Sequence, residues 1–431
     1  MNHIFGKYND FVKSNEQLQA LKEAEKQFKK LQYLNAYRNL LEYLMNPRRD
    51  NIKILEDTES VIKFELIQGS KRCLVTLSPT DILAESIVAM IKQNNVSLLR
   101  KLLEQNYYLI YSKTLLKDNQ IIIRFNSNTI DCPPEKLYLG LIELTVKADS
   151  MDDIILDQFN DYLIPVDEEI KISLHDEIKK IKYKYFVKWI EETLNKILNF
   201  DESVDPLIIS YLLLTLTYRI DYLLHPEGVL SSELENINYT YFLDETKTID
   251  EKIDYVTNLY RELLDKNETE ILKNFYYLNN SFSLLQPVSY QVVQEVIAEN
   301  QRHIKWLEDN ALEEYKTVIY EYISGYCLFN FKLPKPIVKL LHIVFMILYP
   351  EYFNDLGIEE RLYSKEKNSF NISLIKEKIC NIITESKELY TELEFNTDEL
   401  NFETQDKFFQ TFYTLISKMN LKQKDADSGN N

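Results

Sequence analysis

The sequence predicts an α+β domain, with an antiparallel sheet and flanking helices, followed by a larger all-α domain. Short β-rich runs are confined to residues 51–127, and after Pro165 almost every apolar run has helical spacing. The chain has 431 residues, of which 45% are hydrophobic, so it can form two or three domains with cores of their own. We expect an α+β domain over 1–164, an all-helical domain over 165–419 and a mobile tail over 420–431.

The first part of the α+β domain is predicted from the spacing of its apolar residues. Residues 13–45 carry an amphipathic helical stripe and are expected to form one long helix that ends at Pro47. Three β-rich runs then read as an antiparallel meander with a turn at Gly69-Ser70. They cover residues 51–56, 61–68 and 72–78. A short helical stretch is expected from Pro79 and Asp81, and a second helix over 96–105.

A hairpin is expected next, in the stretch NYYLIYSKTLLKDNQIIIRFNSN. Residues 107–116 and 120–127 form its strands, and Asp118-Asn119 forms its turn. Pro133-Pro134 then starts a helix whose apolar residues alternate in steps of four and three, which places them on one face. These residues are Leu137, Leu141, Leu144, Ala148, Met151 and Ile155. The sheet is the nearest surface that this face can cover.

The predicted order is helix, three strands, helix, two strands, helix. With the run LLRKLLEQNYYLIYSKTLLKDNQIIIRFNSNTIDCPPEKLYLGLIELTVKADS, it resembles the type III secretion chaperone-like domain shared with the YbjN family. The resemblance covers about a third of the chain and implies a curved antiparallel sheet packed on flanking helices. It also implies capture of a peptide segment of a partner, on the sheet, at a strand edge or along the first helix. Domains of this type are usually dimers, but the long helical extension leaves the oligomeric state open.

The remainder is predicted to be helical, with Pro206, Pro287, Pro334 and Pro350 between helices. The expected helices are 174–199, 206–224, 248–265, 267–279, 288–308, 310–325, 335–349, 372–391 and 404–419. No solenoid repeat is evident. The longest apolar blocks, 207–218 and 337–349, are too short to span a bilayer, so we expect core helices and no membrane insertion.

Composition excludes several classes of function. The net charge of −18 argues against binding to a nucleic acid backbone or an anionic membrane. Only seven glycines occur, and no Walker A, GxGxxG, GxSxG or HExxH motif is present. Four widely spaced cysteines and the lack of an apolar signal segment suit a reducing cytoplasm. We therefore expect a cytoplasmic protein that is not an enzyme and holds no cofactor or metal.

Two groups of acidic residues are candidate metal sites. Asp221 with His225, and Glu299 with His303, are each one helical turn apart, with Glu295 a further turn from the second pair. The alternative is an ordinary pair on a helix surface. A second group stacks Asp149, Asp153 and Asp157, with Asp152 beside them, on one helix face that could hold Mg²⁺. No partner cluster completes that site, so a solvated face is the simpler interpretation.

The segment KKIKYKYFVKW, residues 179–189, is a candidate partner-binding patch. Lys180, Lys182 and Lys184 accompany Trp189 in an otherwise acidic chain, and basic residues among aromatics can bind an acidic partner. The acidic stretch 385–406 of the same chain is one such partner. The alternative interpretation is a buried helical stripe with lysines on the outer face. That stripe contains Ile178, Ile181, Tyr185 and Trp189.

Tyr107, Tyr108 and Tyr111, expected on the first strand of the hairpin, are a second candidate partner-binding group. Exposed tyrosine is favoured at protein interfaces. The alternative is composition alone, because the chain contains 30 tyrosines.

The expected function is that of a non-enzymatic adaptor or chaperone-like protein that captures a segment of another protein on its N-terminal domain. Two alternatives remain open. The chain could be a structural subunit of a larger secretion or defence assembly, or a metal-dependent enzyme with a site in the helical half.

Overall fold

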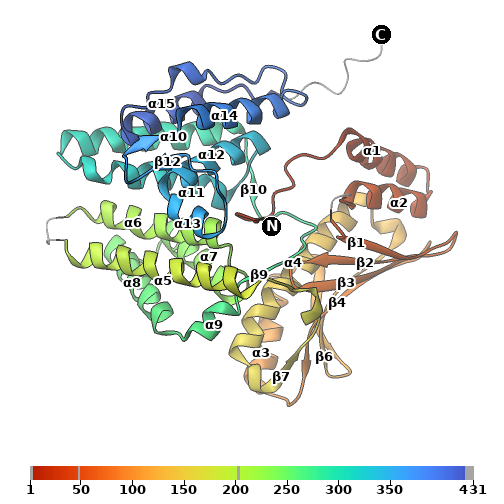
Figure 1. The fold of residues 1–431 in the computed structure, drawn as a ribbon. Coiled ribbons are helices and arrows are strands. Elements are labelled where there is room, and N and C mark those ends of the chain that lie inside the picture. The colour runs from red at the N-terminus through yellow and green to blue at the C-terminus, as the bar shows by residue number, and fades with distance from the viewer. Residues whose placement is uncertain (1–2, 47–48, 201–203, 423–431) are drawn as a thin grey trace, which may run out of the picture.

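The computed structural model describes residues 3–46, 49–200 and 204–422 and confirms the predicted fold class. An N-terminal antiparallel sheet with flanking helices is followed by a helical domain (Figure 1). The position of Pro47 and residues 423–431 of the expected mobile tail lie outside the described residues.

The first helical segment is a hairpin of two helices, α1 (Asn15–Lys29) and α2 (Tyr33–Leu44). The prediction of one helix over 13–45 was therefore wrong. The chain breaks at Leu31, whose φ of 63° is incompatible with a right-handed helix. Ser14 and Gln17 form a capping box at the start of α1. Folding back allows α1 to pack along α2, which buries Ala24.

Six long strands and one short strand form a single sheet in the order β1-β2-β3-β4-β6-β5, with β7 paired to the end of β4. Every pairing in this sheet is antiparallel. The strands are β1 (Ile52–Asp57), β2 (Ile62–Gln68), β3 (Lys71–Leu77), β4 (Asp81–Ile91), β5 (Ser112–Lys117), β6 (Gln120–Asn128) and β7 (Leu163–Pro165).

The short helical stretch expected from Pro79 and Asp81 is instead strand β4. Its side chains alternate between buried and accessible positions, so Ile82, Ala84 and Ser86 point into the core. Pairing with both β3 and β6 makes it a central strand of the sheet. Tertiary pairing thus overrides the helix-start signal that Pro79 and Asp81 suggest.

One long helix, α4 (Pro134–Gln158), covers the inner face of the sheet. All six residues predicted for its apolar face are buried. Gly140 lets the helix approach closely, because a Cβ there would lie 2.7 Å from the ring of Phe125. The predicted helix over 96–105 is confirmed as α3 (Val96–Gln105), capped by Asn95.

The helical domain contains most of the predicted helices. They are α5 (Asp176–Leu198), α6 (Pro206–Arg219), α7 (Gly228–Leu243), α8 (Ile249–Asp265), α9 (Glu268–Leu272), α10 (Tyr290–Asp309), α11 (Lys316–Asn330), α12 (Lys335–Leu348), α13 (Pro350–Asp355), α14 (Ile372–Ser386) and α15 (Gln405–Ser417). Helices α7 and α13 were not predicted. The helix expected over 267–279 stops after five residues, because the chain then forms strand β9 (Tyr276–Tyr277) against β8 (Ile172–Ser173).

Helix α6 continues directly into a π-helical turn, η4 (Ile220–Leu224). By length and composition alone, Pro206–Leu224 could cross a membrane, with a mean hydropathy of 1.4. However, 83% of this segment is buried among neighbouring elements of the helical domain. The other apolar block, within α12, is also almost entirely buried.

The two halves of the chain exchange segments. Residues 3–13 leave the sheet domain and lie on the helical domain, where the Gly6 amide donates to the Tyr222 carbonyl and Asn9 donates to that of Leu333. Figure 1 accordingly shows the N-terminus between the two halves. In return, Phe282 from the helical half is buried in the core of the sheet domain. The two cores are therefore joined by contacts in both directions.

Candidate functional site

Helix α3, the turn that follows it and strand β5, residues 96–117, carry the most exposed large hydrophobic side chains in the part of the chain that the structure describes. We call this region the α3 corner. Among the described residues, the four most exposed large hydrophobic side chains all belong to it. They are Tyr107 at 87%, Ile110 at 83%, Val96 at 74% and Leu103 at 72%, and the corner also contains Tyr108 at 67%. Clustered exposed apolar residues mark interaction sites more often than single ones do.

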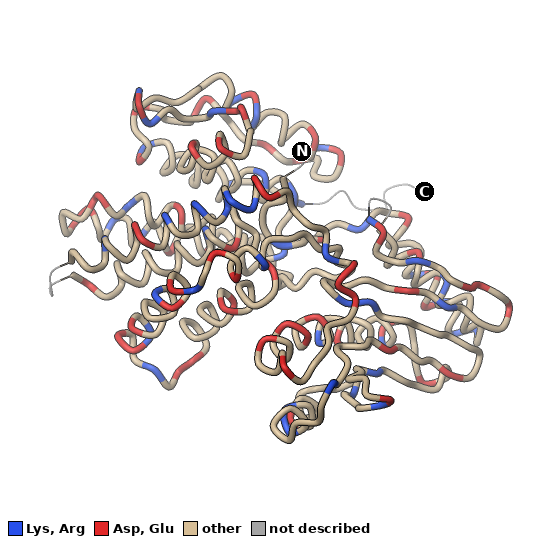
Figure 2. The backbone as a smooth tube through the Cα atoms, turned by 60° about the horizontal axis from the view of Figure 1, so that its bottom comes forward, with Lys and Arg blue, Asp and Glu red and all other residues tan. Residues whose placement is uncertain are grey.

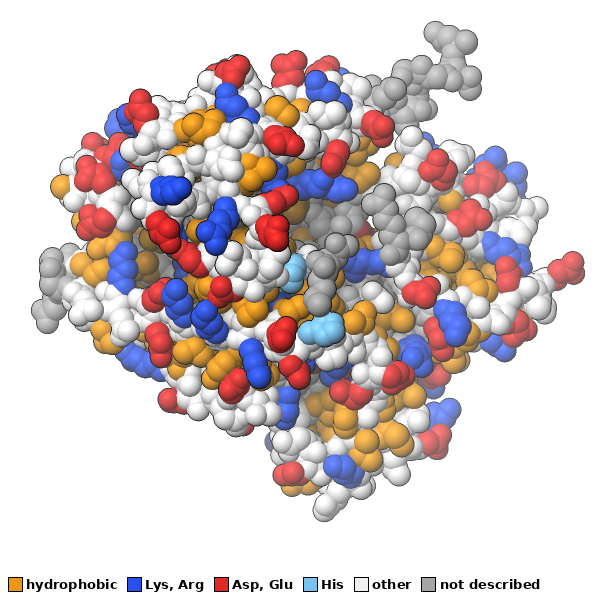
Figure 3. Space-filling view, in the orientation of Figure 1, with side chains coloured by type: hydrophobic (Ala, Val, Ile, Leu, Met, Phe, Trp, Pro, Cys, Tyr) orange, Lys and Arg blue, Asp and Glu red, His pale blue; other side chains and the backbone are white. Residues whose placement is uncertain are grey.

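Helix α3 explains how this surface arises. Leu98 and Leu102 face the sheet and are buried, whereas Val96 and Leu103, seven residues apart, share the opposite face. The chain leaves α3 in a tight turn that presents Tyr107 and Tyr108, whose rings meet edge to face with centroids 5.3 Å apart. In Figure 3, hydrophobic side chains gather at the lower end of the N-terminal domain, near α3 and β7 of Figure 1.

The α3 corner is also basic. Its charged residues are Arg100, Lys101, Lys113 and Lys117 against a single Glu104, in a chain of net charge −18. Along most of the chain, by contrast, acidic and basic residues are intermixed (Figure 2). None of these four cations forms an ion pair with another described residue. Their charge is therefore available to an external acidic group.

The structure places the predicted tyrosines just before β5, not on it, because the strand begins at Ser112. Tyr107 and Tyr108 are exposed, and Tyr111 is partly buried against the sheet-domain core. Val96, Leu103 and Ile110 were missed by the sequence reasoning. The signal was present, because the paired leucines of VSLLRKLLEQ give α3 two apolar faces and only one can pack on the sheet.

The conformation of the α3 corner is fixed by two polar side chains. Glu143 on α4 accepts hydrogen bonds from the amides of Ile110, Tyr111 and Ser112. Asn106 donates to the Thr114 carbonyl at 3.0 Å and accepts from its amide at 2.6 Å. These bonds use main-chain groups at the outer edge of β5 that an added strand would need. An added strand therefore cannot pair with this part of the β5 edge, so a ligand there must be recognised by side chains.

The second predicted patch, residues 179–189, does not form a continuous surface. Lys182 and Trp189 are buried on α5, at 2% exposure each, and Tyr185 and Ile178 are buried with them. Lys180 and Lys184 are exposed, and Lys184 pairs with Asp355 at 2.8 Å. The interpretation as a buried stripe is correct for these apolar residues, but Lys182 does not lie on the outer face. The acidic stretch 385–406 pairs elsewhere, with Lys339 through Glu385 and with Lys376 through Asp398.

A second unusual region lies where the two halves meet, and we call it the polar junction. On the sheet side, the Ser70 amide and hydroxyl both donate to Asp149, and Lys71 pairs with Asp152 at 2.8 Å. Lys71 and Asp152 are each 1% exposed. Lys71 also donates to the carbonyls of Val88 and Val166, which satisfies its remaining protons.

On the helical side of the polar junction, the π turn ends at His225 in a left-handed conformation with φ of 46°. Lys182 donates to the Leu224 carbonyl at 2.5 Å, and its ammonium lies over the ring of Tyr277. Lys7, from the N-terminal segment, lies 3.7 Å from Asp221 and 2.9 Å from Glu235. Three segments remote in sequence therefore supply the cations.

Burial changes the proton affinity of these groups. It raises the pKa of Asp149 and of Asp221 to about 6 each, and it lowers the pKa of Lys182 to about 7. Burial together with the charge of Asp149 raises the pKa of Asp153 to about 7. Burial and the nearby Lys182 lower the pKa of His225 to about 3, so this imidazole is neutral at physiological pH.

The polar junction brings together residues that the sequence singled out separately: Asp149, Asp152 and Asp153, the Asp221–His225 pair, and Lys182. It encloses a cavity of about 70 Å³. Within the chain segments that the structure describes, no group of three or more His, Cys, Asp or Glu residues has the geometry of a metal site. Glu227, whose pKa burial and then Asp149 raise well above its usual range, contacts His225 at 3.4 Å. Asp152 and Asp221 pair with lysines of the same chain, and Asp149 accepts hydrogen bonds from Ser70, which is the arrangement of an internal brace.

The two predicted acid–histidine pairs do not come together. His225 contacts Glu227 and not the carboxylate of Asp221, with which it shares only a main-chain hydrogen bond. His303 instead contacts Tyr211, and Glu299 and His303 line a different cavity from His225. Asp157 is exposed, whereas Asp152 is buried and Asp149 and Asp153 are partly buried.

Comparison with known proteins assigns the chain to no family. No protein-family model matches the chain, and no curated protein matches its sequence.

Proposed function

We propose that this protein is a non-enzymatic adaptor of the cytoplasm that binds a segment of a partner protein at the α3 corner. The observation that supports this most directly is the concentration there of the four most exposed large hydrophobic side chains among the described residues. Holding such side chains in water is unfavourable by roughly 25 cal/mol per Å² of apolar surface. A partner that covers them recovers this free energy.

The chemistry of the α3 corner defines the partner. Arg100, Lys101, Lys113 and Lys117 lie on the two elements that flank the exposed turn, α3 and β5, and have no acidic partner in the described chain. The complementary ligand is a segment in which Asp or Glu alternates with aromatic or aliphatic anchors. Such a segment would place its anchors between Leu103 and the Tyr107–Tyr108 pair, with its carboxylates toward the basic rim.

The proposal agrees with the resemblance to the type III secretion chaperone-like and YbjN domains, whose expected role is peptide capture. It differs in the mode of binding, because Asn106 and Glu143 already occupy main-chain groups along β5. We therefore propose recognition by side chains on a helix-and-turn surface. The polar junction then serves to hold this surface in a fixed position relative to the helical domain.

The test is site-specific photocrosslinking in the native cells. A benzoylphenylalanine is placed at Tyr107 in the full-length chain, and matched control chains carry it at Tyr239, which is 57% exposed on α7. We expect the Tyr107 probe to give a discrete adduct, identified by mass spectrometry, that the Tyr239 probe does not give. The bound region of the partner should be acidic and apolar.

A second measurement tests the contacts themselves. A synthetic peptide of the crosslinked region should bind full-length protein, and Tyr107→Ser with Tyr108→Ser should weaken it at least tenfold. Raising the salt concentration from 0.05 to 0.5 M should weaken it further, because the basic rim contributes by charge. Equal adducts from both probe positions, or a peptide that binds the double variant as tightly as the wild type, would refute the proposal.

A further inference from the structure

A separate cavity of about 250 Å³ lies in the helical domain, between α6, α7, α10 and α11. Its wall contains five aromatic rings drawn from three of these helices. They are Tyr211, Tyr241, Phe242, Tyr322 and Tyr326. Tyr211 packs edge to face against Tyr322 at 4.8 Å between centroids, and Tyr322 stacks on Tyr326 at 5.5 Å. These contacts hold the three rings in a fixed arrangement.

Among the described residues, Glu299 on α10 is the one acidic residue in this wall, and no Lys or Arg lines the cavity. Its carboxylate is close enough that, after burial, its charge contributes to raising the pKa of Tyr211. It acts in the same direction on Tyr326. Glu299 itself is exposed and forms no ion pair with another described residue. The cavity therefore combines several aromatic rings with one carboxylate that has no ion-pair partner among the described residues.

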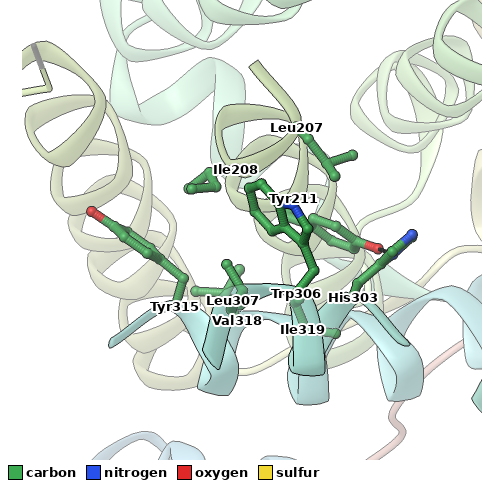
Figure 4. Close-up of a pocket in the computed structure, with 9 residues that line it drawn as sticks. All are labelled: Leu207, Ile208, Tyr211, His303, Trp306, Leu307, Tyr315, Val318 and Ile319. Carbon is green, nitrogen blue, oxygen red and sulfur yellow. Dashed lines mark hydrogen bonds between the residues drawn. The ribbon is translucent and has the colours of Figure 1, made fainter. Parts of the chain in front are cut away.

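The polar back wall has a defined pattern of donors. Asn300 donates to the Val296 carbonyl through its amide nitrogen, which leaves its oxygen to accept from the Tyr211 hydroxyl at 2.8 Å. Because that hydroxyl has only one proton, the contact between Tyr211 and Nδ1 of His303 requires the imidazole to donate. Nε2 of a neutral His303 is then an acceptor. Figure 4 shows Tyr211 and His303 turned toward each other beside a small apolar pocket that also contains Trp306.

From this geometry we propose that the cavity binds a small organic cation with a methylated ammonium group. Aromatic faces attract a cation through the ring quadrupole, and methyl groups fill an apolar cage better than a strongly hydrated ion does. Glu299 supplies the opposite charge at the rim, and Nε2 of His303 can accept a hydrogen bond from a hydroxyl or amine of the ligand. This inference is independent of the α3 corner and of the adaptor function.

Two other ligand classes fit the wall less well. A metal ion needs several oxygen, nitrogen or sulfur ligands at close range, whereas the side chains here that could supply them are Glu299, His303, Asn300, Ser210 and the tyrosine hydroxyls. Among these, Asn300 and Tyr211 already bond to each other. An anion would be repelled by Glu299 and by the ring faces.

The test is calorimetric titration of the full-length chain with choline. The comparison ligand is 3,3-dimethylbutan-1-ol, which has the same shape and no charge. We expect saturable binding of choline and at least tenfold weaker binding of the neutral isostere. Trp306, in the adjoining pocket, supplies a second readout as a saturable change in its fluorescence with the same midpoint.

Two glutamates on one helix provide the matched variants. Glu299→Gln should weaken choline binding about fivefold or more. Glu295→Gln, one turn earlier and outside the cavity, should leave it unchanged. Because both residues are exposed, neither substitution should unfold the protein. The inference is overturned if choline shows no saturable binding at millimolar concentration, if the isostere binds equally well, or if the two variants behave alike.

Discussion

The polar junction and the α3 corner depart from the usual distribution of side chains in opposite ways. At the junction the molecule buries charges, including a Lys71–Asp152 pair that is 1% exposed on both sides. At the α3 corner it leaves the most exposed of its described large apolar side chains in water, with Tyr107 at 87%. In the junction, Lys71, Asp152, Lys7 and Asp221 each have a charged partner in the same chain. At the α3 corner, the four basic side chains have no ion-pair partner among the described residues, and the apolar side chains are in solvent.

This difference separates a structural role from a binding role. Buried charges require partners at fixed positions, so Lys71 and Asp152 constrain the packing of β3 on α4. Lys7 in turn ties the N-terminal arm to the helical domain through Asp221 and Glu235. Exposed apolar groups impose no such constraint on the fold, and their free energy is available to an external partner. Substitutions at the junction should therefore change stability, and substitutions at the α3 corner should change binding alone.

The largest expected effect is that of Lys71→Ala. It would leave the carboxylate of Asp152 buried without its cation, which typically destabilises a protein by about 3–5 kcal/mol. The measurement is chemical denaturation of the full-length chain. Lys63→Ala is the control, because Lys63 pairs with Glu56 at the surface and such pairs contribute about 0–1 kcal/mol. Equal losses in the two variants would mean that the junction pair is no more constrained than a surface pair.

Gly69→Ala should have the next largest effect. A Cβ at this position would lie 1.9 Å from a carboxylate oxygen of Asp149, and its φ of +57° disfavours a side chain. We expect a loss of about 2–3 kcal/mol. Gly357→Ala separates the two causes, because Gly357 also has a positive φ, +80°, but a Cβ there meets nothing within 4 Å. This control should lose only about 1 kcal/mol, and a loss as large as that of Gly69→Ala would contradict the close contact.

Asp153→Asn should stabilise the protein in a manner that depends on pH. The pKa of Asp153 is raised from 3.8 to about 7, so the folded state binds more protons than the unfolded state between these values. The contribution of Asp153 to the free energy of unfolding therefore falls as pH rises from about 4 to 7. The variant should equal wild type near pH 4 and exceed it by about 1–2 kcal/mol at pH 8. Thermal denaturation at both pH values measures this.

The control for this experiment is Asp157→Asn, one turn further along α4. Asp157 is exposed, so its substitution should change stability by less than about 0.5 kcal/mol at either pH. If Asp153→Asn raised the free energy of unfolding equally at pH 4 and pH 8, the folded state would not raise the pKa of the Asp153 carboxyl.

The smallest expected effect on stability is at the α3 corner. Tyr107→Ser with Tyr108→Ser should change the free energy of unfolding by less than about 0.5 kcal/mol, because both side chains are largely in solvent. Thermal denaturation of the full-length variant checks this. A large loss would show that the tyrosines support the fold, and the contrast with the junction would fail.

Local patterns predicted part of this molecule well. The apolar spacing of α4 placed six residues on one face, and all six are buried. The hairpin turn was expected at Asp118-Asn119, and both residues have the positive φ, 51° and 59°, that a tight two-residue turn requires. In each case the deciding contacts lie within a few residues in sequence.

Features that depend on distant contacts were not predictable. The segment around Leu31 contains no Gly or Pro that would signal the end of a helix. The break there follows from the packing of α1 on α2. Strand β4 follows a helix-start signal, but its pairing with β6 decides its conformation. The polar junction joins Lys7, Lys71, Lys182 and Asp221, and no local pattern relates residues so far apart. Lys182 was expected at the surface because it lies outside the apolar stripe of its own helix. The helical spacing could not show that β9, with Tyr277, also packs against Lys182.

The exchange of segments between the two halves has a consequence for the order of folding during synthesis. Asn9 finds its hydrogen-bond acceptor at Leu333, and Phe5 packs on His342 and Phe353. The sheet domain also lacks Phe282 until that residue has been translated. A ribosome that has completed the sheet domain must therefore add the chain as far as Phe353 before the amino-terminal arm can make all of these contacts. The sheet half of the molecule is thus complete only after most of the helical half has been synthesised.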